Sequence, residues 1–195
     1  MKILIDIDDV LNNLCEEWCL FLNEKHGTSV TYDQVTEWNI RKFFPSLIEE
    51  QVYQPLRDSS LWDRLKPKPG AVEYVKKLMN DGHEIYLCTS TDYRNICDKF
   101  EKVIQKYYPF IGWSQVIVAR RKQMINADFL IDDAPHNLIG GDYIKILFTA
   151  PHNASYDAGG NDMFRADTWG EIYGFISRIT AIHLALYPEG GLNES

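Results

Sequence analysis

The first ten residues constrain the fold of this chain more than any other stretch. Lys2–Val10 begins as an apolar, β-branched run and contains three carboxylates toward its end, those of Asp6, Asp8 and Asp9. Such a run is typical of a buried parallel strand whose carboxyl end opens into a site. Three acids within four residues repel one another unless a cation or a shared proton offsets their charge. The stretch therefore indicates a divalent metal site, and Mg²⁺ suits oxygen ligands best.

The alternation of an extended chain assigns different roles to these acids. Asp6 and Asp8 fall on one side of the backbone and Asp9 on the other. Asp6 and Asp8 therefore form a natural pair, in which one carboxylate attacks and the other moves protons. Capping of the helix that follows at Leu11 explains one of the acids, and we do not expect it to explain all three.

Composition and charge limit the class of protein. The 195 residues, 45% of them hydrophobic, suit one domain with room for an inserted subdomain. The net charge of -8 argues against a partner such as a nucleic-acid polymer, which needs a basic face, but it leaves a small anionic substrate possible. Because no signal peptide, membrane-length apolar run or zinc-like cysteine spacing is found, we expect a cytoplasmic protein with reduced thiols and no membrane partner.

Strand and helix patterns alternate along the rest of the chain. This order predicts an α/β fold with a parallel sheet flanked by helices. Residues 32–62 are rich in aromatic side chains but lack a regular period, which indicates a small helical insertion, and the turn at 66–70 marks the return to the main domain. Further strands are expected at 84–88, 115–118, 127–131 and 143–148, helices at 12–26, 71–80, 95–108 and about 169–186, and a frayed end after them.

Polar side chains follow several of these strands. Thr89 and Ser90 come after the strand at 84–88, Lys122 after the strand at 115–118, and Asp132 and Asp133 after the strand at 127–131. In open parallel sheets, ligands bind outside the carboxyl ends of the strands. The topology therefore brings acids, hydroxyls and a cation to one edge of the sheet.

Each of these groups also has an ordinary structural explanation. Thr89 and Ser90 taken alone form a strand-to-loop turn, and Lys122 taken alone is a solvated lysine like its arginine neighbours at 120 and 121. Lys99 and Lys102 on the preceding helix are rival cations, which we expect on a solvated face. The combination at one edge favours the functional interpretation.

The acids, hydroxyls and cation at this edge of the sheet are suited to phosphoryl transfer. We hypothesise that Asp6 attacks phosphorus and forms an aspartyl phosphate, while Asp8 protonates the leaving alkoxide and then activates water. Thr89 and Lys122 would hold the other phosphate oxygens. Mg²⁺ would bridge Asp6 and a phosphate oxygen, with a carboxylate of the 132–133 pair as a further ligand.

The motifs resemble those of a known superfamily of phosphatases. Asp6-Ile7-Asp8-Asp9-Val10, Thr89, Lys122 and Asp132-Asp133 are similar to the four motifs of the haloacid dehalogenase (HAD-like) superfamily. Other stretches narrow the similarity to the 5'(3')-deoxyribonucleotidases, and it extends over nearly the whole chain. These stretches are Pro67-Lys68-Pro69-Gly70-Ala71-Val72-Glu73, Cys88-Thr89-Ser90 and Leu147-Phe148-Thr149-Ala150-Pro151-His152-Asn153.

The resemblance implies roles for individual residues. Asp6 matches the nucleophile and metal ligand, and Asp8 matches the acid/base, whose backbone carbonyl also binds the metal. The match to the metal-binding acid is closest at Asp133, with Asp132 beside it. The phosphate-binding groups correspond to Thr89, Ser90 and Lys122, and the aromatic base pocket to Trp38 and Trp62.

The resemblance also implies an architecture and a reaction. We expect a HAD-like Rossmannoid core at 1–13 and 65–195, with a helical cap at 14–64 inserted after the first strand. The expected activity is magnesium-dependent hydrolysis of nucleoside monophosphates. Two alternatives stay open, namely a phosphatase for sugar phosphates or another small phosphomonoester, and a non-catalytic phosphate-sensing module. The oligomeric state is also open, with a homodimer as one option.

Two departures from the family pattern bear on these expectations. Asp9 stands where many members have Gly, which adds a charge beside the metal and can alter cation affinity or cap closure. The helical insertion is dissimilar in detail, and insertions of this kind set the choice of substrate.

Overall fold

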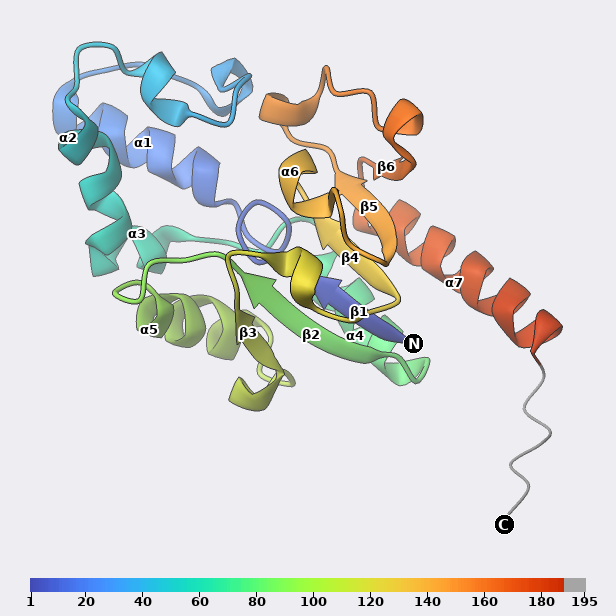
Figure 1. Ribbon diagram of the computed structural model, residues 1–195. Helices are drawn as coiled ribbons and strands as arrows, with labels where there is room; N and C mark the ends of the chain where they lie inside the picture. The colour runs from blue at the N-terminus through green and yellow to red at the C-terminus, as the bar shows by residue number, and fades with distance from the viewer. Residues whose placement is uncertain (188–195) are drawn as a thin grey trace.

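A parallel sheet forms the centre of the molecule (Figure 1), and this computed structural model describes residues 1–187. The strand order β3-β2-β1-β4-β5-β6 places the first strand in the interior of the sheet. The prediction of a parallel sheet flanked by helices is confirmed, whereas the fraying expected after the last helix lies outside the described residues. The strands are β1 (Lys2–Ile5), β2 (Glu84–Thr89), β3 (Val116–Val118), β4 (Phe129–Asp132), β5 (Ile144–Phe148) and β6 (Met163–Ala166).

Helices and single turns connect these strands. The main helices are α1 (Leu14–His26), α2 (Glu49–Tyr53), α3 (Ser59–Arg64), α4 (Ala71–Asn80), α5 (Ile96–Asp98), α6 (Pro135–Leu138) and α7 (Trp169–Leu186). Shorter helical turns used below are η1 (Tyr32–Gln34), η2 (Ile40–Phe43), η3 (Gln54–Arg57), η4 (Lys99–Gln105) and η7 (Pro151–Asn153).

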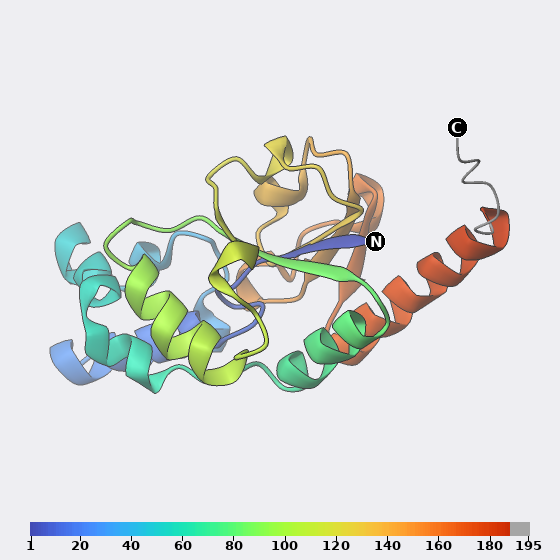
Figure 2. The same ribbon diagram turned by 90° about the horizontal axis from the view of Figure 1, so that it is seen from below.

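The alternation of side chains along β1 divides the hydrophobic core into two layers. Ile3 and Ile5 are fully buried in the larger layer, together with the apolar faces of η4, α4 and α7. Leu4 points to the opposite face and packs in the smaller layer with Leu138 of α6. Figure 2 shows α4 and α7 on one side of the sheet and the segment around α6 on the other. A strand covered on both faces needs the near-continuous apolar run found at the amino terminus.

Two elements differ from the expectation. The sequence pattern did not predict β6, which pairs in parallel with β5 at the edge of the sheet. The central residues of β6, Phe164 and Arg165, are only partly buried, so this strand does not need the continuous apolar run of a fully buried strand. The helix expected at 95–108 begins at Ile96, and η4 within it is π-helical.

Residues 14–64, here called the cap segment, lie beyond the carboxyl ends of β1 and β2 (Figure 1). Two linkers join the cap segment to the sheet, and they run side by side. The Asn13 N–H donates to the Lys66 carbonyl at 3.1 Å, and the Lys68 N–H donates to the Leu11 carbonyl at 2.9 Å. These bonds form a short antiparallel bridge, here called the hinge, so the chain enters and leaves the cap segment at one place.

Asp9 connects this hinge to the first helix of the cap segment. Its backbone has a φ of 56°, in the left-handed region that Gly adopts without strain. The carboxylate oxygens accept the Cys15 N–H at 3.1 and 3.2 Å, and Lys68 of the second linker lies 4.0 Å away. Asn13 makes no side-chain cap bond to α1, and the N–H groups at its amino end are instead capped by Asp9 at Cys15 and by Asn12, whose Oδ1 accepts the Leu14 N–H at 2.9 Å.

We predict that Asp9→Gly is more stable than Asp9→Ala. Both variants lose the cap and the charge of Asp9, so the comparison isolates the left-handed backbone. The left-handed conformation costs the Ala variant about 1–2 kcal/mol. The larger entropy of the unfolded Gly variant offsets part of this difference. Urea denaturation without metal should give the Gly variant a free energy of unfolding about 1 kcal/mol higher. Equal or greater stability of the Ala variant would contradict the strain at this position.

Candidate active site

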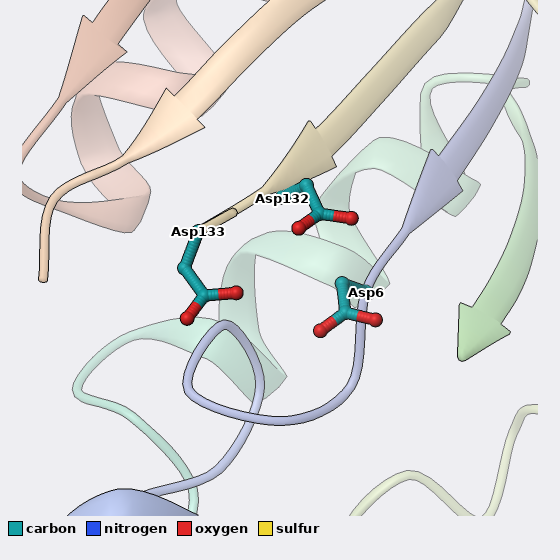
Figure 3. Close-up of side chains that lie close together, drawn as sticks. All are labelled: Asp6, Asp132 and Asp133. Carbon is teal, nitrogen blue, oxygen red and sulfur yellow. The ribbon is translucent and has the colours of Figure 1, made fainter. Parts of the chain in front are cut away.

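Three buried carboxylates meet where β1 and β4 end (Figure 3). Asp6 follows β1, Asp132 ends β4, and Asp133 comes next in the chain. The Asp6 N–H donates to the Ile131 carbonyl at 2.9 Å, which extends the pairing of the two strands into the site. The three side chains each offer a carboxylate oxygen, and these oxygens lie within 4.8 Å of one another. Neighbouring parallel strands therefore produce the acidic cluster that the sequence predicts.

Lys122 is fully buried against two of these acids. Its ammonium donates to Oδ1 of Asp6 and, at 2.6 Å, to Oδ2 of Asp132. Burial by itself lowers the pKa of Lys122, but the two carboxylates outweigh burial and hold its pKa above the ordinary value. The Asp132 carboxylate also accepts the Ala134 N–H at 2.9 Å and the Asn137 amide at 3.1 Å. Asp132 therefore orients Lys122.

The negative charge of the cluster exceeds what its own cations offset. Burial is the main reason that the pKa values of Asp6 and Asp133 are raised, and their mutual repulsion with Asp132 raises them further. Burial also raises the pKa of Asp9 to about 7. Converging carboxylate oxygens with too little positive charge fit a divalent cation with oxygen ligands. A metal ion can therefore be held by Asp6, Asp132 and Asp133.

Asp8 points into a different set of contacts. Its Oδ2 accepts the Lys99 ammonium at 2.6 Å, and its Oδ1 accepts the Asn12 amide at 3.2 Å. Lys99 also donates to the Thr89 hydroxyl at 2.8 Å. Because that hydroxyl oxygen is used as an acceptor, its hydrogen is free to donate to a ligand. One lysine thus orients the proposed proton carrier and a proposed phosphate-binding group.

The expectation that Lys99 lies on a solvated face is wrong. Its side chain is 1% exposed, whereas that of Lys102 is 22% exposed and pairs with Asp63 and Asp98 on the surface. A signal for this was present in the sequence. Lys99 falls within the apolar stripe of its helix, three residues after Ile96 and four before Val103. A lysine in such a stripe is buried when a carboxylate lies nearby.

A cavity of about 700 Å³ opens above the carboxylates and extends beneath the cap segment. This volume is typical of small-molecule sites. Asp6, Asp8, Thr89, Ser90 and Asp133 line the end nearest the sheet. The cap segment contributes Trp18, Trp38, Asn39, Tyr53 and Leu56, and Arg120 and His152 line the sides.

The structure brings most, but not all, of the predicted site residues to this cavity. Trp38 lines it, with 59% of the residue exposed. Trp62 does not reach it, because its ring is buried in the cap segment and its N–H donates to the Leu56 carbonyl at 2.9 Å. Lys122 lies behind Asp6 rather than on the cavity wall.

Several residues that line the cavity are not predicted by the sequence, and Trp18 and Arg120 are two of them. Trp18 belongs to the apolar face of α1, and it also lines the cavity. Arg120 was treated as a solvated side chain, but it lines the same cavity as Thr89 and Ser90. Among residues 1–187 its guanidinium forms no ion pair, so it is available to an anionic ligand.

Comparison with known proteins agrees with this geometry. Residues 1–183 match the family model described as "5' nucleotidase, deoxy (Pyrimidine), cytosolic type C protein". The chain belongs to this family. Its members are phosphoric monoester hydrolases, so the protein is an enzyme of that class. The resemblance inferred from the motifs is confirmed.

Relatives of the nucleotidase family match over most of the chain. A 5'(3')-deoxyribonucleotidase from Bacillus subtilis (strain 168) is 32% identical over 171 residues, covering 87% of this chain and 95% of the relative. Another from Clostridium acetobutylicum is 30% identical over 167 residues, with 86% and 89% covered.

Comparison with solved structures agrees with the fold predicted from the sequence. A HAD family hydrolase from Deinococcus radiodurans R1, solved with bound phosphate and sodium, aligns with a TM-score of 0.61 at 12% identity. The alignment covers 92% of this chain and 96% of that one. The fold is therefore the HAD-like Rossmannoid α/β fold. No helix in residues 1–187 is long and apolar enough to span a membrane.

The raised carboxyl pKa values predict that the metal-free protein loses stability as the pH rises. When the folded-state pKa exceeds the unfolded one, the stabilising contribution is complete below the unfolded pKa and is lost as the pH passes the folded pKa. For Asp9 this interval extends from the ordinary value of 3.8 to about 7. In chelator, we expect the urea concentration at the unfolding midpoint to decrease when the pH is raised from 5.5 to 7.5. The decrease should be smaller for Asp9→Asn. A midpoint that rises equally in both proteins would contradict this assignment.

Proposed function

We propose that the protein hydrolyses deoxyribonucleoside monophosphates in a magnesium-dependent reaction that passes through an aspartyl phosphate on Asp6. One observation carries this proposal most directly. Asp6 lies at the buried end of the cavity, and Lys122 binds only its Oδ1. Within residues 1–187 its Oδ2 forms no hydrogen bond and is free to attack phosphorus in line. Lys122 holds the carboxylate so that this oxygen keeps one orientation.

Asp8 is suited to the proton transfers. Asn12 and Lys99 hold its two carboxylate oxygens, so its side chain is fixed beside the cavity. In the first step it would protonate the leaving alkoxide, and in the second it would take a proton from the water that hydrolyses the aspartyl phosphate. Thr89 and Ser90, at the end of β2, would donate to the phosphate oxygens.

The chain supplies a suitable site for Mg²⁺. Carboxylates of Asp6 and Asp133, with Asp132 beside them and the backbone carbonyl of Asp8, would hold the ion. When bound, Mg²⁺ supplies positive charge that reduces the repulsion between Asp6 and an incoming phosphate.

The wall of the cavity supports a nucleotide as the substrate. Trp18, Trp38 and Tyr53 present aromatic surface on which a base can stack, and relatives covering most of the chain are named 5'(3')-deoxyribonucleotidases. We propose that residues 14–64 form a cap over a core made of 1–13 and 65–195. The cytoplasmic location stays a prediction from the sequence.

A panel of phosphomonoesters tests the proposed function. Phosphate release should be measured from 5'- and 3'-nucleoside monophosphates, in ribo and deoxy forms, and from common sugar phosphates, with Mg²⁺ and with chelator. We expect Mg²⁺-dependent turnover, fastest with deoxyribonucleotides. As a control, Asp6→Asn should lower kcat by ~10³-fold or more while folding normally, because it removes the nucleophile.

Other outcomes of the panel would change the proposal. Faster turnover of sugar phosphates would retain the chemistry and replace the substrate. Turnover by Asp6→Asn at the wild-type rate would rule out the aspartyl phosphate. A wild-type protein that binds phosphate but hydrolyses none of the panel would favour the sensing module.

Lys99 gives a second prediction about catalysis. Lys99→Met keeps the length of the side chain but removes the cation that orients Asp8 and Thr89. We expect kcat to fall by about 10²-fold, in the range of acid–base contributions. Lys102→Met on the same helix is the matched control, because it removes a cation that only contacts Asp63, Asp98 and the Ser59 carbonyl. Equal activity of the two variants would exclude a role of Lys99 in the reaction.

A further inference from the structure

Trp38 of the cap segment lies between two histidines of the core. The centre of its indole is 5.0 Å from the imidazole of His136 and 5.2 Å from that of His152, with interplanar angles of 80° and 79°. Both are edge-to-face contacts, the arrangement that aromatic pairs favour. His136 belongs to α6, which follows β4, and His152 to η7, which follows β5. The indole therefore joins the cap segment to the ends of two central strands.

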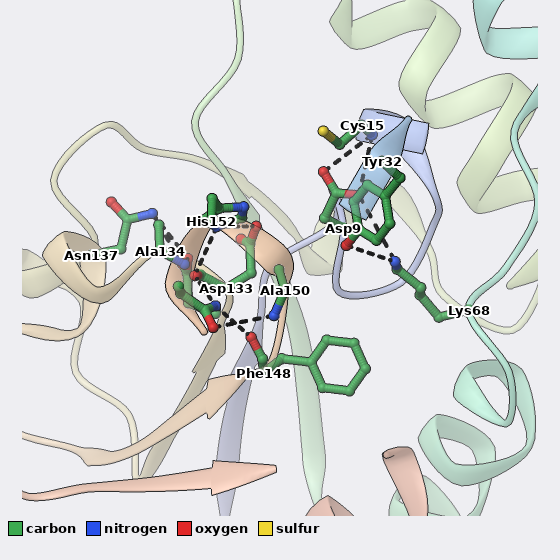
Figure 4. A network of polar contacts seen from close by, with 12 residues as sticks. Asp9, Cys15, Tyr32, Lys68, Asp133, Ala134, Asn137, Phe148, Ala150 and His152 are labelled. Atoms are coloured by element: carbon green, nitrogen blue, oxygen red, sulfur yellow. Dashed lines mark hydrogen bonds and ion pairs between the residues drawn. The ribbon is translucent and has the colours of Figure 1, made fainter. Parts of the chain in front are cut away.

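One of these histidines also holds the proposed metal ligand Asp133 (Figure 4). His152 Nε2 lies 3.2 Å from Oδ2 of Asp133 and 3.1 Å from its backbone carbonyl oxygen. The next residue, Asn153, donates its amide to the same carbonyl at 2.7 Å and to the Phe148 carbonyl at 2.8 Å. The turn after β5 thus fixes both the backbone and the carboxylate of Asp133.

This turn is itself firmly anchored. The guanidinium of Arg165 in β6 donates to Asn153 at Oδ1 and at the backbone carbonyl, both at 3.0 Å, and to the Tyr156 carbonyl at 2.7 Å. The imidazole of His152 is consequently supported from the core, with Asp133 at one nitrogen and Trp38 against its ring. In Figure 1 the light-blue turns of the cap segment reach toward the orange turn after β5, and η1 packs against η7 there.

We propose that Trp38 is a positioning residue for Asp133, acting through His152, so that cap closure and Mg²⁺ binding are coupled. With the cap closed, the indole limits the positions open to the His152 ring, and the ring limits those open to the Asp133 carboxylate. The ion then binds more tightly to the closed form. By linkage, the ion favours the closed form by the same factor. This inference rests on the proposed function only in taking Asp133 as a ligand of Mg²⁺.

A double-mutant cycle on metal affinity tests the coupling. The Kd for Mg²⁺ should be measured by calorimetry, without substrate, for wild type, Trp38→Ala, His152→Ala and the double variant. Removal of a residue that orients a ligand typically weakens metal binding by 10- to 100-fold, and we expect this of His152→Ala. Trp38 itself contacts none of the proposed metal ligands. Trp38→Ala should nevertheless weaken Mg²⁺ binding by ~3- to 10-fold, because the effect is transmitted through His152. In the double variant, loss of Trp38 should add nothing to the loss of His152.

Trp113 provides the matched control. It is another exposed tryptophan, with 56% of the residue accessible, and it packs edge-to-face on Phe100 away from the cavity. Trp113→Ala should leave the Kd within twofold of wild type. Trp38→Phe, which keeps an aromatic ring, should recover part of the affinity lost in Trp38→Ala and guards against a folding defect in that variant. Thermal unfolding without metal should be compared for every variant.

Two results would overturn the inference. A Kd of Trp38→Ala within twofold of wild type, or independent effects that multiply in the double variant, would show that the indole does not act through His152. Neither result would affect the proposed phosphatase activity, because no turnover is measured. A wild-type protein that binds no Mg²⁺ would overturn both this inference and the metal dependence proposed above.

Discussion

The buried contact of Lys122 with Asp6 and Asp132 is the interaction on which the rest of the site depends. Two neighbouring strands end in carboxylates that face each other away from water, an arrangement that costs several kcal/mol per charge without a partner. Lys122 follows β3, at the far edge of the sheet, so this ion pair ties together the ends of three strands. The same ammonium leaves one oxygen of Asp6 uncommitted. A contact that stabilises the fold therefore also orients the proposed nucleophile.

The cap segment is joined to this centre in two different ways. At the hinge, Asp9 accepts the Cys15 N–H at the amino end of α1 and lies near Lys68, so the loop after β1 contacts both the first helix of the cap segment and the second linker. Across the cavity the contact is made by rings, with Trp38 between two imidazoles. The hinge contacts are hydrogen bonds of 2.9 and 3.1 Å between two backbone segments, whereas the ring contacts are edge-to-face and lie among residues that line the cavity. In the coupling proposed above, the hinge limits the direction of cap movement and the rings determine how firmly the cap closes.

The sequence predicts the sheet and the chemical nature of the site well, because both depend on order along the chain. Apolar runs and the polar residues after them locate β1, β2 and β4 and bring Asp6, Thr89 and Asp132 to one edge. Side-chain direction is not contained in such a pattern. Trp38 and Trp62 are both aromatic residues of an irregular segment, yet only Trp38 reaches the cavity. Which ring is buried depends on how short helices pack together.

The two lysines show the same limit in another form. Lys122 is expected at a strand end and Lys99 on a solvated helix face, but the partners of both lysines depend on three-dimensional packing. Lys99 begins a π-helical stretch, whose wider turn shifts side chains away from α-helical positions. Lys122 follows a short strand and turns inward to neutralise Asp6 and Asp132 instead of facing the cavity. The apolar stripe around Lys99 indicates its burial, but local sequence does not identify the partners of either lysine, because their carboxylates are contributed from distant segments of the chain.

The central place of β1 has a consequence for how the molecule forms. Although β1 is made first, its neighbours in the sheet begin at Glu84 and Phe129. The nascent chain therefore carries an apolar strand with both edges unpaired until β2 is made and with one edge unpaired until β4 is made, and contacts so distant in sequence form slowly. The cap segment, residues 14–64, is synthesised long before that point. The acidic cluster assembles only when β4 arrives, so the chemistry of the first ten residues appears late in folding.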